Sequence, residues 1–163
     1  MGAASRESLF VGRCKGCLRV QLLRKWKILN SDEDAQFLLK QKKNLNDYRP
    51  DIIHEALRCI LDSPLNKAGM VGAIYVKIDQ GGMFEVKPHV QLPQTCSRFC
   101  GVIMDLLQKS LVRAKHTNEV LLHVVEEPIT HHLPVNSYTV VGLYCFKLLN
   151  IFGIIFILSC CGF

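Results

Sequence analysis

Residues 49–69 read RPDIIHEALRCILDSPLNKAG, which is the pattern of one complete helix. Pro50 suits the first helical position because it needs no N–H donor there, and Asp51 suits the positive end of the helix dipole. Pro64 ends the pattern, because it lacks a donor and pushes Ser63 toward an extended backbone. One helix is therefore predicted between residues 50 and 61, and its apolar face is formed by Ile52, Ile53, Ala56, Leu57, Ile60 and Leu61.

The chain on both sides alternates between helix and strand patterns. Ser31 precedes three acidic residues, which favour the start of a helix. Two strand-like runs, 73–78 and 83–86, flank a loop with Gly81 and Gly82, and this arrangement suits a hairpin. A third helix is expected over residues 98–114 and a buried strand over 120–125. Together these elements predict an α/β fold.

Length and composition fit one domain, and the charge is concentrated at one end. The chain has 163 residues, 49% apolar and 21% charged, so it is too hydrophobic for wholesale disorder. Its net charge of +6 lies in residues 1–31, where basic residues interrupt the apolar ones and argue against a secretory signal. A nucleic-acid-binding arm, a mitochondrial presequence and a solvated, poorly folded lead-in all fit this segment, and we expect the lead-in.

The eight cysteines do not form a metal-binding pattern. Cys14 and Cys17 have the spacing of half a zinc site, and Cys96 and Cys100 are the other close pair before the C-terminal tail. The two spacings differ and about 80 residues separate the pairs. In a chain without a signal peptide we therefore expect reduced, isolated thiols and no metal site.

Residues 138–163 form a strongly apolar tail with a single charge, Lys147. Because a helix needs about 20 apolar residues to span a bilayer, one reading is a membrane anchor with Lys147 at an interface. A buried strand and helix is a second reading. The third is a translated non-coding segment, since U-rich codons encode most of these residue types.

Four blocks together carry a family resemblance: RPDIIH at 49–54, LDSPLNKAG at 61–69, FEVKP at 84–88 and RFCG at 98–101. Their order and spacing resemble the ribosome-biogenesis methyltransferases that methylate N1 of a pseudouridine in small-subunit ribosomal RNA. The resemblance covers about residues 27–137. It implies a knotted α/β fold of the SPOUT (trefoil-knot methyltransferase) class, a homodimer, S-adenosylmethionine as methyl donor, ribosomal RNA and ribosome assembly factors as partners, and a place in the nucleus and nucleolus.

The resemblance also implies roles for individual residues. Arg49 would contact RNA and Asp51 would act as the catalytic residue that orients the site, although the two side chains could instead simply pair with each other. The family's RNA-gripping arginines correspond to Gln91, Gln94 and Arg98, of which only Arg98 is still basic. Because each phosphate contact strengthens binding and adds to its salt dependence, the two glutamines predict weaker RNA binding.

The chain departs from the family pattern at both ends. Residues 1–26 form a divergent basic segment, 27–137 match the N-terminal portion of the methyltransferase domain, and 138–163 stand where the family has its cofactor loops. We therefore expect a partial SPOUT-type fold lacking the C-terminal knotted half, with no cofactor-binding residue assignable. The functional expectation is a catalytically incomplete rRNA methyltransferase. A non-catalytic rRNA-binding or assembly module and a tail-anchored membrane protein are the alternatives.

Overall fold

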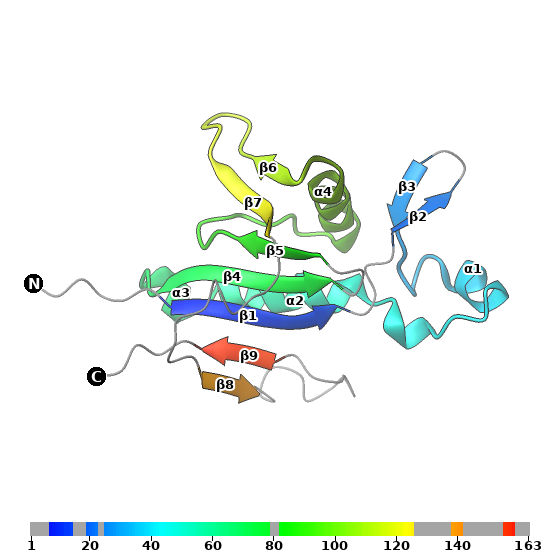
Figure 1. Cartoon of the computed structure of the whole chain (residues 1–163), viewed down its shortest axis with the longest axis horizontal. Coiled ribbons are helices and arrows are strands. Elements are labelled where there is room, and N and C mark those ends of the chain that lie inside the picture. The colour runs from blue at the N-terminus through cyan, green and yellow to red at the C-terminus, as the bar shows by residue number, and fades with distance from the viewer. Residues whose placement is uncertain are drawn as a thin grey trace, which may run out of the picture.

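A seven-stranded mixed sheet forms the centre of the structure, a computed structural model that describes residues 7–14, 19–22, 25–78, 82–125, 138–141 and 155–158, with side chains for 27–77 and 82–125. The strand order is β6-β7-β5-β4-β1-β9-β8, and the β2–β3 hairpin makes a separate two-stranded sheet (Figure 1). The predicted α/β fold is confirmed. The strands are β1 Glu7–Cys14, β2 Arg19–Leu22, β3 Lys25–Ile28, β4 Val71–Ile78, β5 Met83–Val86, β6 Leu111–Arg113, β7 Val120–Val125, β8 Tyr138–Val141 and β9 Ile155–Leu158.

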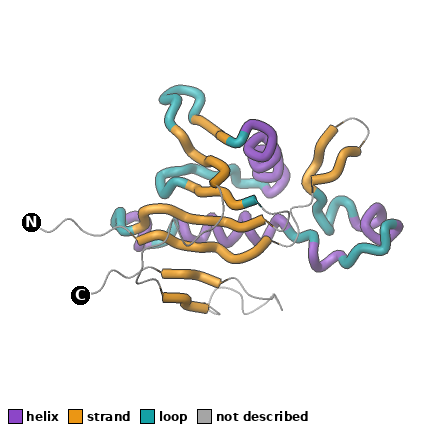
Figure 2. The backbone as a smooth tube through the Cα atoms, viewed as in Figure 1, coloured by secondary structure: helices purple, strands orange, loops and turns teal. Residues whose placement is uncertain are grey.

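Two long helices cover one face of this sheet (Figure 2). The helices are α1 Ala35–Lys40, the 3-10 turn η1 Leu45–Asp47, α2 Pro50–Leu61, α3 Pro64–Lys67 and α4 Cys96–Lys109. Apolar side chains of α2 and α4 pack against alternate residues of β4, β5 and β7, which the strand register places in rows. One such row is Ile74, Val86 and Leu122, all buried.

Helix α2 has the boundaries that its sequence predicts. Pro50 is the first helical residue and Asp62 is the C-cap. Ser63 then caps the short helix α3, since its hydroxyl accepts the Asn66 N–H at 3.2 Å and donates to the Ile60 carbonyl at 2.6 Å. The predicted β4–β5 hairpin is likewise confirmed, with antiparallel pairing from Ile74–Val86 to Lys77–Met83.

Two helices differ from the prediction in their extent. Helix α1 begins at Ala35 and not at Ser31, because the acidic residues close a turn instead: Asp34 accepts the Asn30 N–H at 3.1 Å, and Asn30 accepts the Asp32 N–H at 3.1 Å. Helix α4 ends at Lys109 and not at residue 114. Ser110 adopts a left-handed conformation, with φ of 59°, and the next residues pair with β7 as strand β6.

The N-terminal segment also differs from the expected lead-in. Residues Glu7–Cys14 form β1, which pairs in parallel with β4 on one side and antiparallel with β9 on the other. The expectation of a poorly folded lead-in is therefore wrong for these residues. The sequence contains the reason, since the apolar run 9–11 can pair with two neighbouring strands.

The apolar tail contributes strands β8 and β9 to the same sheet, and β8 is its last strand. The rest of residues 138–163, including Lys147, lies outside the described residues. Among the helices that are described, none combines the length and the apolar character needed to cross a bilayer.

Candidate functional site

Arg49 and Asp51, the two residues of the RPD block with predicted roles, form a forked ion pair at the start of α2. Arg49 donates from Nε to the Asp51 carboxylate oxygens at 2.9 and 3.2 Å, and from Nη2 at 2.6 Å. The side chains are 28% and 29% exposed. Hydrogen bonding to Asp51 raises the pKa of Arg49 against the opposing effect of burial, with further help from the charges of Asp51 and Asp32. The pairing alternative is thus what the structure shows, while the RNA and catalytic roles stay predictions.

The other predicted residues lie on or next to the loop 87–95, which joins β5 to α4. Gln91 and Gln94 are exposed on this loop, and Arg98 is exposed in the first turn of α4. The loop is held against α2 because His54 Nε2 lies 2.7 Å from the Pro93 carbonyl oxygen. His54 is one helical turn from Asp51, so Pro93 and its neighbour Gln94 lie near the beginning of α2.

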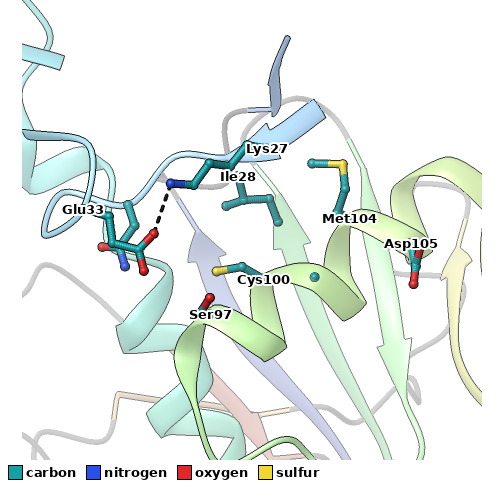
Figure 3. Close-up of a pocket in the computed structure, with 9 residues that line it drawn as sticks. Lys27, Ile28, Glu33, Ser97, Cys100, Met104 and Asp105 are labelled. Carbon is teal, nitrogen blue, oxygen red and sulfur yellow. Dashed lines mark hydrogen bonds and ion pairs between the residues drawn. The ribbon is translucent and has the colours of Figure 1, made fainter. Parts of the chain in front are cut away.

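A cleft of about 420 Å³ separates the end of β3 and the following turn from α4 (Figure 3). Ile28 and Met104 form its apolar part, and Glu33, Ser97 and Asp105 its polar part. Lys27 reaches across the turn and pairs with Glu33 at 3.0 Å and Asp34 at 2.9 Å. Burial lowers the pKa of Lys27, but the hydrogen bonds to these two carboxylates outweigh it, so the net pKa is raised.

Cys100 lines this cleft, and Cys96 lies one helical turn before it on α4, whereas the sequence predicts isolated thiols. Both are free thiols. Burial, followed by the neighbouring Cys96, raises the pKa of Cys100 to about 12, and burial also raises that of Cys96. The negative charge of Asp51 raises the pKa of Cys96 further, which places the start of α4 within electrostatic reach of the Arg49–Asp51 pair. Their i, i+4 spacing was the available signal, but the predicted helix began at residue 98 and so left Cys96 outside it, whereas α4 begins at Cys96.

The cleft between Lys27 and α4 does not fit S-adenosylmethionine. Its adenine, ribose and amino-acid groups need an apolar slot lined by converging donors and acceptors. One wall of the cleft is α4, whose backbone groups bond along the helix, and its nearest cation, Lys27, is already paired with two carboxylates. We assign no cofactor-binding residue and no reaction step to this cleft.

Metal ligation was not predicted, and the described part of the chain holds no group of three His, Cys, Asp or Glu side chains suited to a metal ion. Cys17 of the Cys14–Cys17 spacing lies outside the described residues.

Comparison with known proteins gives the chain its family. The model of the EMG1/NEP1 methyltransferase family matches residues 17–145. Ribosomal RNA small subunit methyltransferase nep-1 of Caenorhabditis elegans is 46% identical over 110 residues, which cover 68% of this chain and 47% of the relative. The human relative, Ribosomal RNA small subunit methyltransferase NEP1, is 36% identical over 121 residues, covering 74% and 49%.

A solved structure, Archaeoglobus fulgidus Nep1 bound to S-adenosylhomocysteine, has a similar fold. The TM-score is 0.59 at 20% sequence identity, and the match covers 80% of this chain and 64% of that one. This similarity confirms the SPOUT-type fold for the part that is matched. The chain spans about half the length of the curated relatives that it matches. With a family model that covers most of its residues, this chain belongs to the EMG1/NEP1 methyltransferase family.

Proposed function

We propose that this chain binds small-subunit ribosomal RNA and serves the methylation of that RNA at N1 of a pseudouridine. One observation carries the proposal: the loop 87–95 exposes Gln91 and Gln94 and leads to Arg98 at the start of α4, and His54 fastens that loop to α2, the helix that begins beside Arg49. Arginines next to exposed amide side chains can contact phosphates and bases of a single-stranded loop. The named relatives, which are ribosomal RNA small subunit methyltransferases, support the same class of RNA.

The reaction requires mainly positioning. Methyl transfer is an in-line displacement, so the protein must hold N1 of the flipped-out base against the methyl donor and help it to lose its proton. In this proposal Arg49 binds the RNA. Asp51 orients Arg49 through their forked ion pair, and its carboxylate is the group that helps N1 of the nucleobase to lose its proton. The family's methyl donor, S-adenosylmethionine, supplies the methyl group.

RNA binding is tested by titrating a small-subunit ribosomal RNA hairpin with the full chain over a series of salt concentrations. Arg49→Ala and Arg98→Ala should each weaken binding and lower the salt slope by about one counterion. Lys115→Ala is the matched control, because Lys115 is an exposed cation in the turn between β6 and β7. No binding by the unmodified chain at low salt, or equal losses in all three variants, would overturn the proposal.

A second candidate function is an rRNA-binding or assembly module without catalysis. The observation that favours it is the poor fit of the described cleft to S-adenosylmethionine. Transfer of tritium from methyl-labelled S-adenosylmethionine to hairpin RNA that carries the pseudouridine separates the two functions. Label in the RNA supports the enzyme, whereas tight RNA binding without label supports the module.

Localisation and assembly follow from the same proposal. A protein that acts on small-subunit RNA during ribosome biogenesis should accumulate in the nucleolus and associate with assembly factors, and we propose a homodimer by analogy with the family. Imaging of the tagged chain tests the location, and analytical ultracentrifugation tests the dimer. A uniform distribution through the cytoplasm would contradict the first of these.

A further inference from the structure

The loop 87–95 has little hydrogen bonding of its own, although it carries Gln91 and Gln94. Lys87 N–H donates to the Leu121 carbonyl at 3.0 Å at the beginning of the loop, and Val90 N–H closes one turn on the Lys87 carbonyl at 3.1 Å. A loop of this length with so few backbone hydrogen bonds needs other contacts if it is to hold one conformation. Val90, which is 6% exposed, anchors the middle of the loop in the core, and two side chains from the α2–α3 region hold the two ends of the loop.

The first contact is made by His54 to the far end of the loop. Its Nε2 lies 2.7 Å from the Pro93 carbonyl oxygen, and a carbonyl can only accept, so this nitrogen carries the proton. The imidazole is 5% exposed, and its ring lies 4.9 Å from that of Phe99 at 31°. Packing on Phe99 and the helix backbone of α2 thus fix the direction in which the donor points.

The second contact is made by Asn66 to the near end of the loop. Its side-chain amide donates to two carbonyl oxygens, that of Pro88 and that of Leu61, both at 2.8 Å. Leu61 is the last residue of α2, where carbonyls have lost their helical partners. One amide therefore ties the end of α2 to the beginning of the loop, and both of its N–H groups are used.

We propose that His54 and Asn66 are positioning residues that clamp the loop 87–95 at Pro88 and Pro93, and so hold the loop that presents Gln91 and Gln94 to RNA. The clamp acts on the backbone, so it works whatever side chains the loop carries. Its role in recognition rests on the proposed function, whereas its role in ordering the loop does not. Neither residue need touch RNA.

Variants of His54 and Asn66 separate the effect of losing the N–H donor from the effect of losing side-chain volume. His54→Phe keeps an aromatic ring against Phe99 and loses the donor, whereas His54→Gln restores an N–H near the position of Nε2. Asn66→Asp keeps the shape and replaces both donors with acceptors. His116→Phe is the control, because His116 is an exposed histidine in the β6–β7 turn.

Hydrogen exchange of the full chain, read by mass spectrometry, measures the order of the loop without RNA. His54→Phe and Asn66→Asp should speed exchange of the 88–95 peptide at least about tenfold and leave the β4 peptide unchanged. His54→Gln should return the rate to within a few fold of the unmodified chain, and His116→Phe should not change it. Unchanged loop exchange in both clamp variants, or acceleration of every peptide together, would overturn the clamp.

Titration with the RNA hairpin then tests recognition. His54→Phe should weaken binding with an unchanged salt slope, because Gln91 and Gln94, the loop side chains proposed to meet RNA, are neutral, whereas Arg98→Ala should lower the slope. Rescue of affinity by His54→Gln is a result that lost core packing would not give. Loss of slope in His54→Phe contradicts the positioning role. If the unmodified chain binds no RNA, the proposed function fails while the exchange measurement still decides the clamp.

Discussion

The ion pair between Arg49 and Asp51 fixes the position of the guanidinium but contributes little to the stability of the fold. Both side chains are more than a quarter exposed, and an ion pair in such surroundings contributes only about 0–1 kcal/mol. The fork nevertheless fixes a planar guanidinium at the start of α2, where a lysine could offer only a point charge. The pairing and an RNA role are therefore compatible, since a positioned arginine still presents its outer edge to a phosphate.

Asp51→Asn should lower the free energy of unfolding by no more than about 1 kcal/mol, because the lost pair is partly solvated. The same change should weaken RNA binding, since Arg49 loses the carboxylate that orients its guanidinium. Urea unfolding and hairpin titration measure the two effects. Asp62→Asn, at the exposed C-cap of α2, changes the net charge equally and is the control. RNA binding that is unchanged or tighter in Asp51→Asn relative to Asp62→Asn would contradict this account.

The raised pKa of the Cys100 thiol makes the free energy of unfolding depend on pH. Its pKa is raised from about 9 to about 12, so the folded chain keeps a proton that the unfolded chain releases near pH 9. Stability is therefore unaffected by this group below pH 9 and falls as pH rises from 9 toward 12. Urea unfolding at pH 8, 9 and 10 should show this decline. Cys100→Ala should make it shallower, whereas Met104→Leu, a change in the same cleft without titration, should keep it.

At the scale of the element, the boundary between α4 and β6 depends on one residue. Ser110 stops the helix in a left-handed conformation, with φ of 59°, and its carbonyl accepts the Val124 N–H at 2.9 Å. Such a conformation costs a residue with a β-carbon roughly 1–2 kcal/mol, and glycine is the usual residue there. A serine in this place hid the boundary from the sequence pattern, which continues apolar through residues 111 and 112.

Ser110→Gly should raise the free energy of unfolding by about 0.5–1 kcal/mol, because relief of the left-handed strain exceeds the added flexibility of the unfolded chain. Ser97→Gly, at an exposed position inside α4, should instead lower it by about 0.5 kcal/mol. Thermal and urea unfolding of the two variants measure these changes. A loss of stability in both would show that Ser110 is not strained.

The helices and strands could be predicted from residues that are neighbours in the sequence. Contacts between residues far apart in the sequence could not. Pro50, Ser63 and the apolar face of α2 specify that helix from neighbouring residues, as the glycines specify the β4–β5 hairpin. The loop clamp joins residues 39 positions apart, at His54 and Pro93, and 22 apart, at Asn66 and Pro88. No periodicity records such a contact, because it depends on how α2 and α4 pack on the sheet.

At the scale of the whole molecule, β1 joins the strands of the family-like region to the strands of the apolar tail in one sheet. It lies between β4 of the family-like region and β9 of the apolar tail. Both rows of its backbone groups therefore face a neighbouring strand, which is the position in a sheet that tolerates proline least. The basic beginning of the chain thus includes a strand in the interior of the sheet. The pairing of residues 7–14 with both neighbouring strands is therefore the property to test.

Phe10→Pro should destabilise the full chain by about 1–3 kcal/mol more than Phe10→Ala. Both variants remove the aromatic side chain, but only proline removes the N–H that faces β4 or β9 and leaves a carbonyl without a donor. Urea unfolding followed by far-ultraviolet circular dichroism measures the difference, and hydrogen exchange locates it. Exchange should rise in β4 as well as in β1, because β4 loses a partner along that edge. Equal stability of the two variants would mean that the Phe10 N–H bonds to neither neighbouring strand, and the pairing of β1 would have to be revised there.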